Sequence, residues 1–168
     1  MEPPENQDKI LELFKQGPSI LENALVGLSD IELDYAPMNG GWTIRQIIHH
    51  IADGDDLWKT CIKIALGNEQ AEFTLQWYKA LPQTAWAKCW SYENRSIEIS
   101  IALLKTNRDH IIQLLEYVHD GWSKSVQFRD SNGEIEVVPV GVVIQMQADH
   151  VVHHVKRISA IRKEISST

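Results

Sequence analysis

Apolar residues recur at three- and four-residue spacings over four long stretches of the chain, which is the pattern of amphipathic helices. In the third stretch, Ile97, Ile101, Leu104, Ile111 and Leu114 keep this spacing. We therefore expect four long helices, at about residues 8–28, 43–66, 91–118 and 140–165. Gly17-Pro18 lies inside the first stretch and predicts a kink there, because proline removes a backbone donor.

The second helix has unusually complete start and stop signals. Thr43 and Gln46 form the T-x-x-Q pattern of a capping box, and Trp42 with Ile47 occupy the positions of a hydrophobic staple. Gly67-Asn68 ends the helical pattern.

The period changes before the last helix. Residues 124–140 alternate between apolar and polar, and Asn132-Gly133 at the centre is the strongest short-range signal of a hairpin turn. The pattern predicts an all-α fold, a four-helix bundle with a small β-hairpin before the last helix, formed by a single domain over residues 1–168.

The composition narrows the function classes. A net charge of -7 without a basic stripe argues against a nucleic-acid surface. No run of 18 apolar residues exists, so no membrane span is expected, and the polar, acidic N-terminus is unlike a signal peptide. Cys61 and Cys89 form no CxxC motif, and we expect both to be buried free thiols of a cytoplasmic protein.

Five of the seven histidines fall in two clusters, one in the second helix and one in the last. On a helical wheel of the last helix, with His150 at zero, the apolar stripe covers roughly 20° to 140°. His154 lies near 40° inside this stripe, and His150 lies at its edge. His153 lies near 300°, so we expect it to point away from the core.

The same construction on the second helix places His50 beside the apolar face. It places His49 with Arg45 on the side expected to face water. Gly54 follows His50 by one turn and is expected to leave space beside it. His110 and His119 occur among polar residues and are expected on the surface.

His50, His150 and His154 are the candidate metal ligands. Histidines at i and i+4 present both imidazoles on one helical face, and bundles commonly hold metals between facing helices. Three protein ligands with an open position are typical of catalytic sites, and Asp53 and Asp149 are the carboxylates available to orient the ligands. Alternatively, HxxxH occurs by chance in many helices, and the three histidines would then be packing residues.

The motifs resemble those of the DinB/YfiT-like superfamily of metal-binding four-helix bundles. Trp42, Thr43, Arg45, His50, Ile51 and Asp53 fill its W-[ST]-x-R-x-x-x-x-H-[LI]-x-[DE] pattern, and His150 with His154 fill its HxxxH pattern. The double histidines are closest to the YfiT-like subgroup. This resemblance implies that the three histidines bind a divalent metal, Zn²⁺ or Ni²⁺, and that the chain is a metal-dependent hydrolase or thiol S-transferase.

Such an enzyme would activate water or a low-molecular-weight thiol for attack on a small-molecule substrate. The sequence does not identify the general base, and His153 is a candidate for it. The family also implies a homodimer, which no residue of the sequence specifies. The alternative function is a non-catalytic, stress-related metal-binding bundle, and the middle segment, residues 69–90, matches the family only loosely and is expected to shape the substrate pocket.

Overall fold

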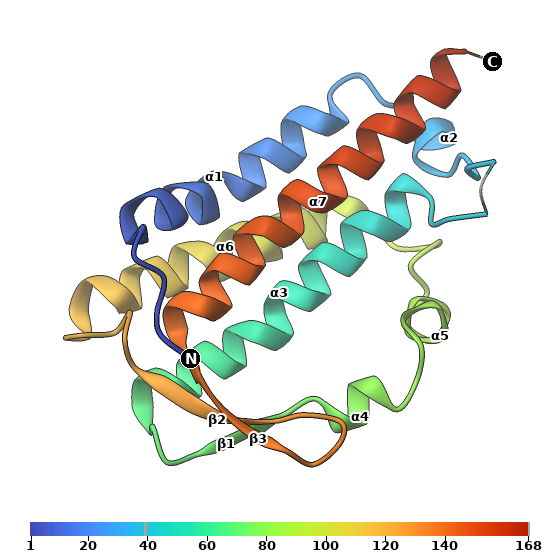
Figure 1. Cartoon of the computed structure of the whole chain (residues 1–168). Coiled ribbons are helices and arrows are strands. Elements are labelled where there is room, and N and C mark those ends of the chain that lie inside the picture. The colour runs from blue at the N-terminus through green and yellow to red at the C-terminus, as the bar shows by residue number, and fades with distance from the viewer. Residues whose placement is uncertain (39, 168) are drawn as a thin grey trace.

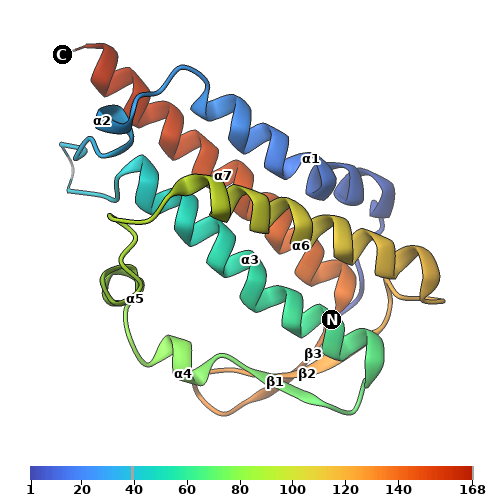
Figure 2. The ribbon, with the colours of Figure 1, turned by 180° about the vertical axis from the view of Figure 1, so that it is seen from behind.

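A computed structural model describes residues 1–38 and 40–167 of the chain. Four long helices run side by side as a bundle, with a small sheet and short helices at the periphery (Figures 1 and 2). The helices are α1 (Gln7–Leu25), α2 (Asp30–Leu33), α3 (Ile44–Gly67), α4 (Gln76–Lys79), α5 (Gln83–Cys89), α6 (Ile97–Tyr117) and α7 (Val140–Ser166). The strands are β1 (Glu72–Thr74), β2 (Ser125–Arg129) and β3 (Ile135–Pro139). The predicted four-helix bundle with a hairpin before the last helix is confirmed.

The packing of the long helices makes α3 and α7 direct neighbours. Helix α1 packs on α6 and α7, and α3 packs on α6 and α7 in the same way. The two histidine clusters of the sequence therefore lie on adjacent helices, which is the first requirement for a shared site. No helix in the described part of the chain is long and apolar enough to cross a membrane.

The start of α3 follows from its sequence. The Thr43 backbone N–H donates to Oε1 of Gln46 at 3.0 Å, and the Gln46 N–H donates to Oγ1 of Thr43 at 3.2 Å. This reciprocal pair is the predicted capping box, and it fixes where the helix that carries His50 begins.

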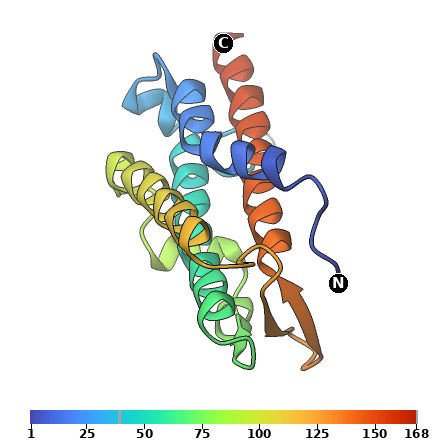
Figure 3. The ribbon, with the colours of Figure 1, turned by 90° about the vertical axis from the view of Figure 1, so that its left-hand side faces the viewer.

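Helix α1 continues through Pro18 because another helix replaces the missing donor. Proline has no N–H for the carbonyl of Phe14, four residues earlier. The guanidinium of Arg108 on α6 donates to that carbonyl at 2.7 Å instead. A Cβ at position 17 would lie 2.0 Å from Nη1 of Arg108, so Gly17 provides the space for this contact. Helix α1 changes direction along its length, as Figure 3 shows.

Arg108 also reaches the other two long helices. It donates to Oδ1 of Asp55 on α3 at 3.2 and 3.0 Å and to the carbonyl of Gln147 on α7 at 2.8 Å, with only 1% of its surface exposed. Burial raises the pKa of Asp55 and lowers the pKa of Arg108, although each faces the opposite charge. Desolvation therefore outweighs the mutual attraction, and this pair fixes geometry more than it adds stability.

The third long helix begins later than its pattern predicts. The spacing predicts a start at Ser91, but α6 begins at Ile97. Ser91 has a φ of 51°, in the left-handed region that interrupts a helix. The turn at this residue directs Tyr92 into the interior, where 1% of it is exposed.

The sheet contains one strand more than the predicted hairpin. Strand β2 pairs antiparallel with β3, and Gly133 in the connecting turn has a φ of 87°. Strand β1 pairs with β2 in parallel and brings Phe73 against Trp58 of α3 and Phe128 of β2, with ring centroids 5.8 and 6.1 Å away. The sheet thus covers the half of α3 that follows His50.

Candidate metal centre

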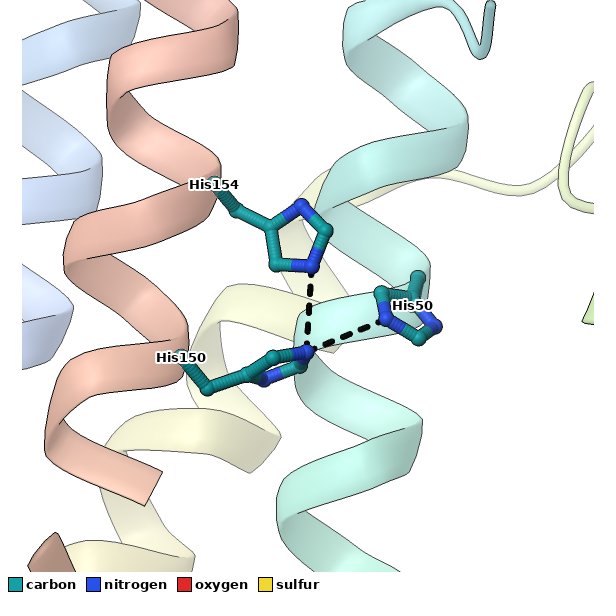
Figure 4. Close-up of side chains that lie close together, drawn as sticks. All are labelled: His50, His150 and His154. Atoms are coloured by element: carbon teal, nitrogen blue, oxygen red, sulfur yellow. Dashed lines mark hydrogen bonds between the residues drawn. The ribbon is translucent and has the colours of Figure 1, made fainter. Parts of the chain in front are cut away.

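The structure brings His50, His150 and His154 together. His50 projects from α3, and the other two project from successive turns of α7 (Figure 4). Nε2 of His150 lies 3.1 Å from Nε2 of His50 and 3.0 Å from Nε2 of His154. The possible ligand atoms of all three residues lie within 4.8 Å of one another. In the described part of the chain, this group is the one that could hold a metal ion.

The separation of the three nitrogens suits a divalent metal. Nitrogens bound to zinc at about 2.05 Å on the corners of a tetrahedron lie about 3.3 Å apart, close to the distances observed here. Hydrogen bonding alone satisfies the cluster poorly, because an imidazole nitrogen carries either one proton or one lone pair. Nε2 of His150 therefore cannot form two full hydrogen bonds to its two neighbours.

Burial keeps the three imidazoles in the form that binds metals. Desolvation, with smaller contributions from neighbouring positive groups, lowers the pKa of His50 to about 3, that of His150 to about 4 and that of His154 to about 2. All three are neutral near pH 7, and a neutral imidazole has the free lone pair that a metal needs.

Neither of the available carboxylates, Asp53 or Asp149, is hydrogen-bonded to Nδ1 of His50 or of His154. Nδ1 of His50 and Nδ1 of His154 are buried without a hydrogen-bond partner. Asp53 instead accepts a hydrogen bond from Nη1 of Arg95 at 3.1 Å, and Asp149 is exposed. Packing orients the ring of His50 in place of a carboxylate, since the edge of Trp42 meets it with ring centroids 4.7 Å apart.

The prediction for His49 is also wrong. Its side chain is fully buried, with an exposure of 0%. Nε2 donates to the carbonyl of Arg95 at 3.1 Å, so Nδ1 is the acceptor for the hydroxyl of Ser100 on α6 at 2.8 Å. His49 therefore ties α3 to α6 and faces away from the metal centre. Arg45, expected beside it in water, is also buried and donates to Asp34 at 2.7 Å.

His153 points outward as predicted. It is exposed, and its ring lies against the ring of His154 with centroids 5.1 Å apart. Within the described chain, His153 is therefore adjacent to the three-histidine cluster but does not belong to it. His110 and His119 are exposed, as expected.

A cavity of about 100 Å³ opens beside the three histidines, and His50 and His150 form part of its wall. Gly54 also lines it. A Cβ there would meet Cε1 of His150 at 3.6 Å, an ordinary van der Waals contact, and no atom of His50 within 4 Å, so the prediction that Gly54 leaves space beside His50 is wrong. The rest of the lining comes from α3, from the middle segment and from the start of α7: Leu57, Trp58, Leu75, Tyr78, Gln83, Met146 and Gln147.

Sequence reasoning placed the middle segment near the pocket but did not identify these residues. Leu75, Tyr78 and Gln83 do come from that segment. The available signal was its density of aromatic residues: Tyr78 stacks on Trp86 and Trp90, with ring centroids 5.6 and 6.0 Å away. These rings pack the segment on itself.

The sequence and the fold are similar to those of known proteins. YfiT of Bacillus subtilis is 24% identical over 161 residues, which cover 96% of this chain and 86% of YfiT. The solved structure of YfiT, described as a probable metal-dependent hydrolase with an unusual four-helix bundle topology, matches 99% of this chain and 94% of that one at 22% identity, with a TM-score of 0.81. A protein of Oceanobacillus iheyensis that is named as a putative metal-dependent hydrolase is 29% identical over 146 residues. The match covers 87% of this chain and 80% of the relative.

A more distant likeness concerns the fold alone. The crystal structure of a mycothiol-dependent maleylpyruvate isomerase matches 89% of this chain and 59% of that chain, at 18% identity and a TM-score of 0.64. The model of the DinB superfamily matches residues 13–158, which include both histidine clusters. The chain therefore belongs to the DinB superfamily.

Proposed function

We propose that the protein is a metal-dependent enzyme in which His50, His150 and His154 hold one divalent metal ion, Zn²⁺ or Ni²⁺. The observation that carries the proposal is the convergence of three neutral Nε2 atoms, 3.0 and 3.1 Å apart, beside a cavity. Imidazole nitrogen suits both metals. A metal bound there would supply Lewis acidity, which lowers the pKa of a coordinated water or thiol.

We propose hydrolysis or thiol transfer as the reaction class. The relatives named as metal-dependent hydrolases favour activated water, and the mycothiol-dependent neighbour favours a low-molecular-weight thiol. The cavity beside His50 and His150 gives a small substrate access to the side of the cluster that the protein leaves open.

The protein's own side chains limit where a proton can go. The described lining of the cavity contains no carboxylate. Burial raises the pKa of Tyr78, so its hydroxyl stays protonated near pH 7 and does not supply a phenolate base. His153 is exposed beside His154 and is the candidate proton acceptor at the edge of the centre.

Metal analysis of protein purified without an affinity tag tests this proposal. We expect about one equivalent of metal in the wild type and in His153→Ala. We expect the metal to be lost in His50→Ala and His154→Ala, because each removes one of only three protein ligands. Equal loss in His153→Ala and His154→Ala would contradict the assignment of ligands.

Turnover is measured next, with the metal-loaded protein and a panel of small electrophiles, with and without thiols. Metal-loaded His153→Ala should bind metal normally and turn over more slowly. A protein that holds metal but never turns over would instead be a metal-binding bundle without catalysis.

A further inference from the structure

The cavity beside the histidines has a predominantly apolar wall. Its volume is about 100 Å³, and five of its lining side chains present carbon or sulfur surface. Two come from α3, two from the segment after it and one from α7: Leu57, Trp58, Leu75, Tyr78 and Met146. Such a wall stabilises an apolar group that leaves water.

The wall also lacks formal charge. No aspartate, glutamate, lysine or arginine is among its described residues. Apart from the two imidazoles, its polar side-chain groups are the amides of Gln83 and Gln147, the hydroxyl of Tyr78 and the indole N–H of Trp58. The Gln147 amide is already engaged, since Nε2 donates to the carbonyl of Gly54 at 3.4 Å.

Two charged groups near the histidines, Arg108 of α6 and Asp53 of α3, are paired, and Arg157 of α7 is exposed and outside the lining. Arg108 is 1% exposed and is bound by Asp55 and two carbonyls. Asp53 is paired with Arg95. A carboxylate placed against this wall would lose its hydration without meeting a cationic side chain among the described lining residues, which is costly.

The volume limits the size of the group. A cavity of about 150 Å³ lined by apolar side chains binds benzene, and water occupies about 30 Å³ of liquid volume. By this scale, 100 Å³ holds a group somewhat smaller than benzene, with about four or five non-hydrogen atoms.

We propose that the substrate places an uncharged, apolar group of this size, such as a short alkyl chain, in the cavity while its reactive group lies at the three histidines. This inference rests on the proposed function and names its substrate class: small neutral electrophiles such as short-chain acyl compounds, and not dicarboxylates.

Alkyl hydroxamates test the proposal, because their head group binds metals while the tail enters the adjacent space. Binding to the zinc-loaded protein is measured by calorimetry for acetohydroxamate, butyrohydroxamate and the monohydroxamate of succinate. Each buried methylene gives about fourfold, so butyrohydroxamate should bind about fifteenfold tighter than acetohydroxamate. The succinate derivative, with a charged tail, should bind no tighter than acetohydroxamate.

A matched pair of variants locates the effect. Met146 lies at the mouth of the cavity and is 39% exposed, and Met146→Arg should remove the gain from the longer alkyl tail and favour the succinate tail. Gln145→Arg adds the same charge to the neighbouring, exposed position of α7 outside the lining and should leave the tail preference unchanged.

A metal-free measurement separates this inference from the proposed function. In the metal-free protein, butyramide should shift the NMR signal of the Met146 methyl group, and succinamate should not. If the protein holds no metal, the proposed function fails. The amide titration still shows whether the cavity binds an uncharged apolar group. Binding that is independent of the tail, with no shift from butyramide, would overturn the substrate class and leave the metal site intact.

Discussion

Asp55→Asn is the substitution that most directly tests how the four helices are held together. The new carboxamide would keep an oxygen acceptor for Arg108 and nearly the same volume, but the substitution removes the negative charge. The guanidinium of Arg108 would then stay in the interior, 1% exposed, without a counter-charge.

The expected cost follows from what remains around Arg108. Removing one partner of a buried ion pair typically costs about 3–5 kcal/mol. Arg108 retains the carbonyls of Phe14 and Gln147 and the ring of Phe14, whose centroid lies 4.4 Å from its Cζ. These dipoles solvate part of the charge, so we expect the lower end, about 3 kcal/mol. Domains have a total stability of about 5–15 kcal/mol, so the loss is a large fraction of it.

The assay is urea unfolding followed by circular dichroism. With an m-value of about 2 kcal/mol/M, the midpoint should fall by about 1.5 M. Asp56→Asn is the matched control, because Asp56 is the adjacent residue and its side chain is 46% exposed in a surface pair with Lys59. Its removal should cost at most about 1 kcal/mol. If both variants lose the same small amount, the charge of Asp55 is not needed and the reasoning is refuted.

Three further predictions concern single residues. Gly17→Ala should destabilise the protein by about 1–3 kcal/mol in urea unfolding, because the new Cβ would lie 2.0 Å from Arg108; a gain in stability, as at an ordinary helical glycine, would contradict this contact. Only Cys89 should react with a thiol reagent at pH 8 in the folded protein, since Cys89 is exposed and burial raises the pKa of Cys61 to about 12; mass spectrometry showing two labels would oppose it. His49→Leu should lower the free energy of unfolding by at least about 2 kcal/mol while the metal content stays unchanged. A loss below about 0.5 kcal/mol would instead support the prediction that His49 faces water.

The helices and the convergence of the three histidines could be predicted because both follow from a period. A 3.6-residue repeat places His154 inside the apolar stripe of α7 and His50 at the border of the stripe on α3, and both are buried. The hairpin was equally local, since Asn132-Gly133 specifies the reversal of the chain within a few residues.

The period failed for His49 because α3 has two neighbours. A wheel identifies one apolar stripe and assigns the rest to water, but α3 packs on α7 with one side and on α6 with another. At His49 the contact with α6 is polar and is satisfied by Ser100 and by the carbonyl of Arg95, so this position carries no hydrophobic signal. The same limit applies to Arg45, whose partners Asp30 and Asp34 belong to the preceding segment.

Two other misses have separate causes, one in long-range pairing and one in a residue-type tendency. Strand β1 has three residues and forms only by pairing in parallel with β2, more than fifty residues later, so no local alternation marks it. The prediction that Cys89 is buried was wrong, because the burial tendency of cysteine is a property of the residue type and not of this position at the end of α5.

The polar contacts of the interior help to explain how a metal centre can form between two helices. Hydrophobic burial is non-directional and would allow α3 and α7 to slide along one another. Arg108 binds Asp55, five residues after His50, and the carbonyl of Gln147, three residues before His150. One side chain therefore sets the register of both helices near the three histidines. Its third partner is the carbonyl that Pro18 leaves without a donor, which ties α1 to the same point. The cost of burying this charge is therefore offset by a fixed geometry, which helps to hold Nε2 of His150 at 3.1 Å from that of His50 and at 3.0 Å from that of His154.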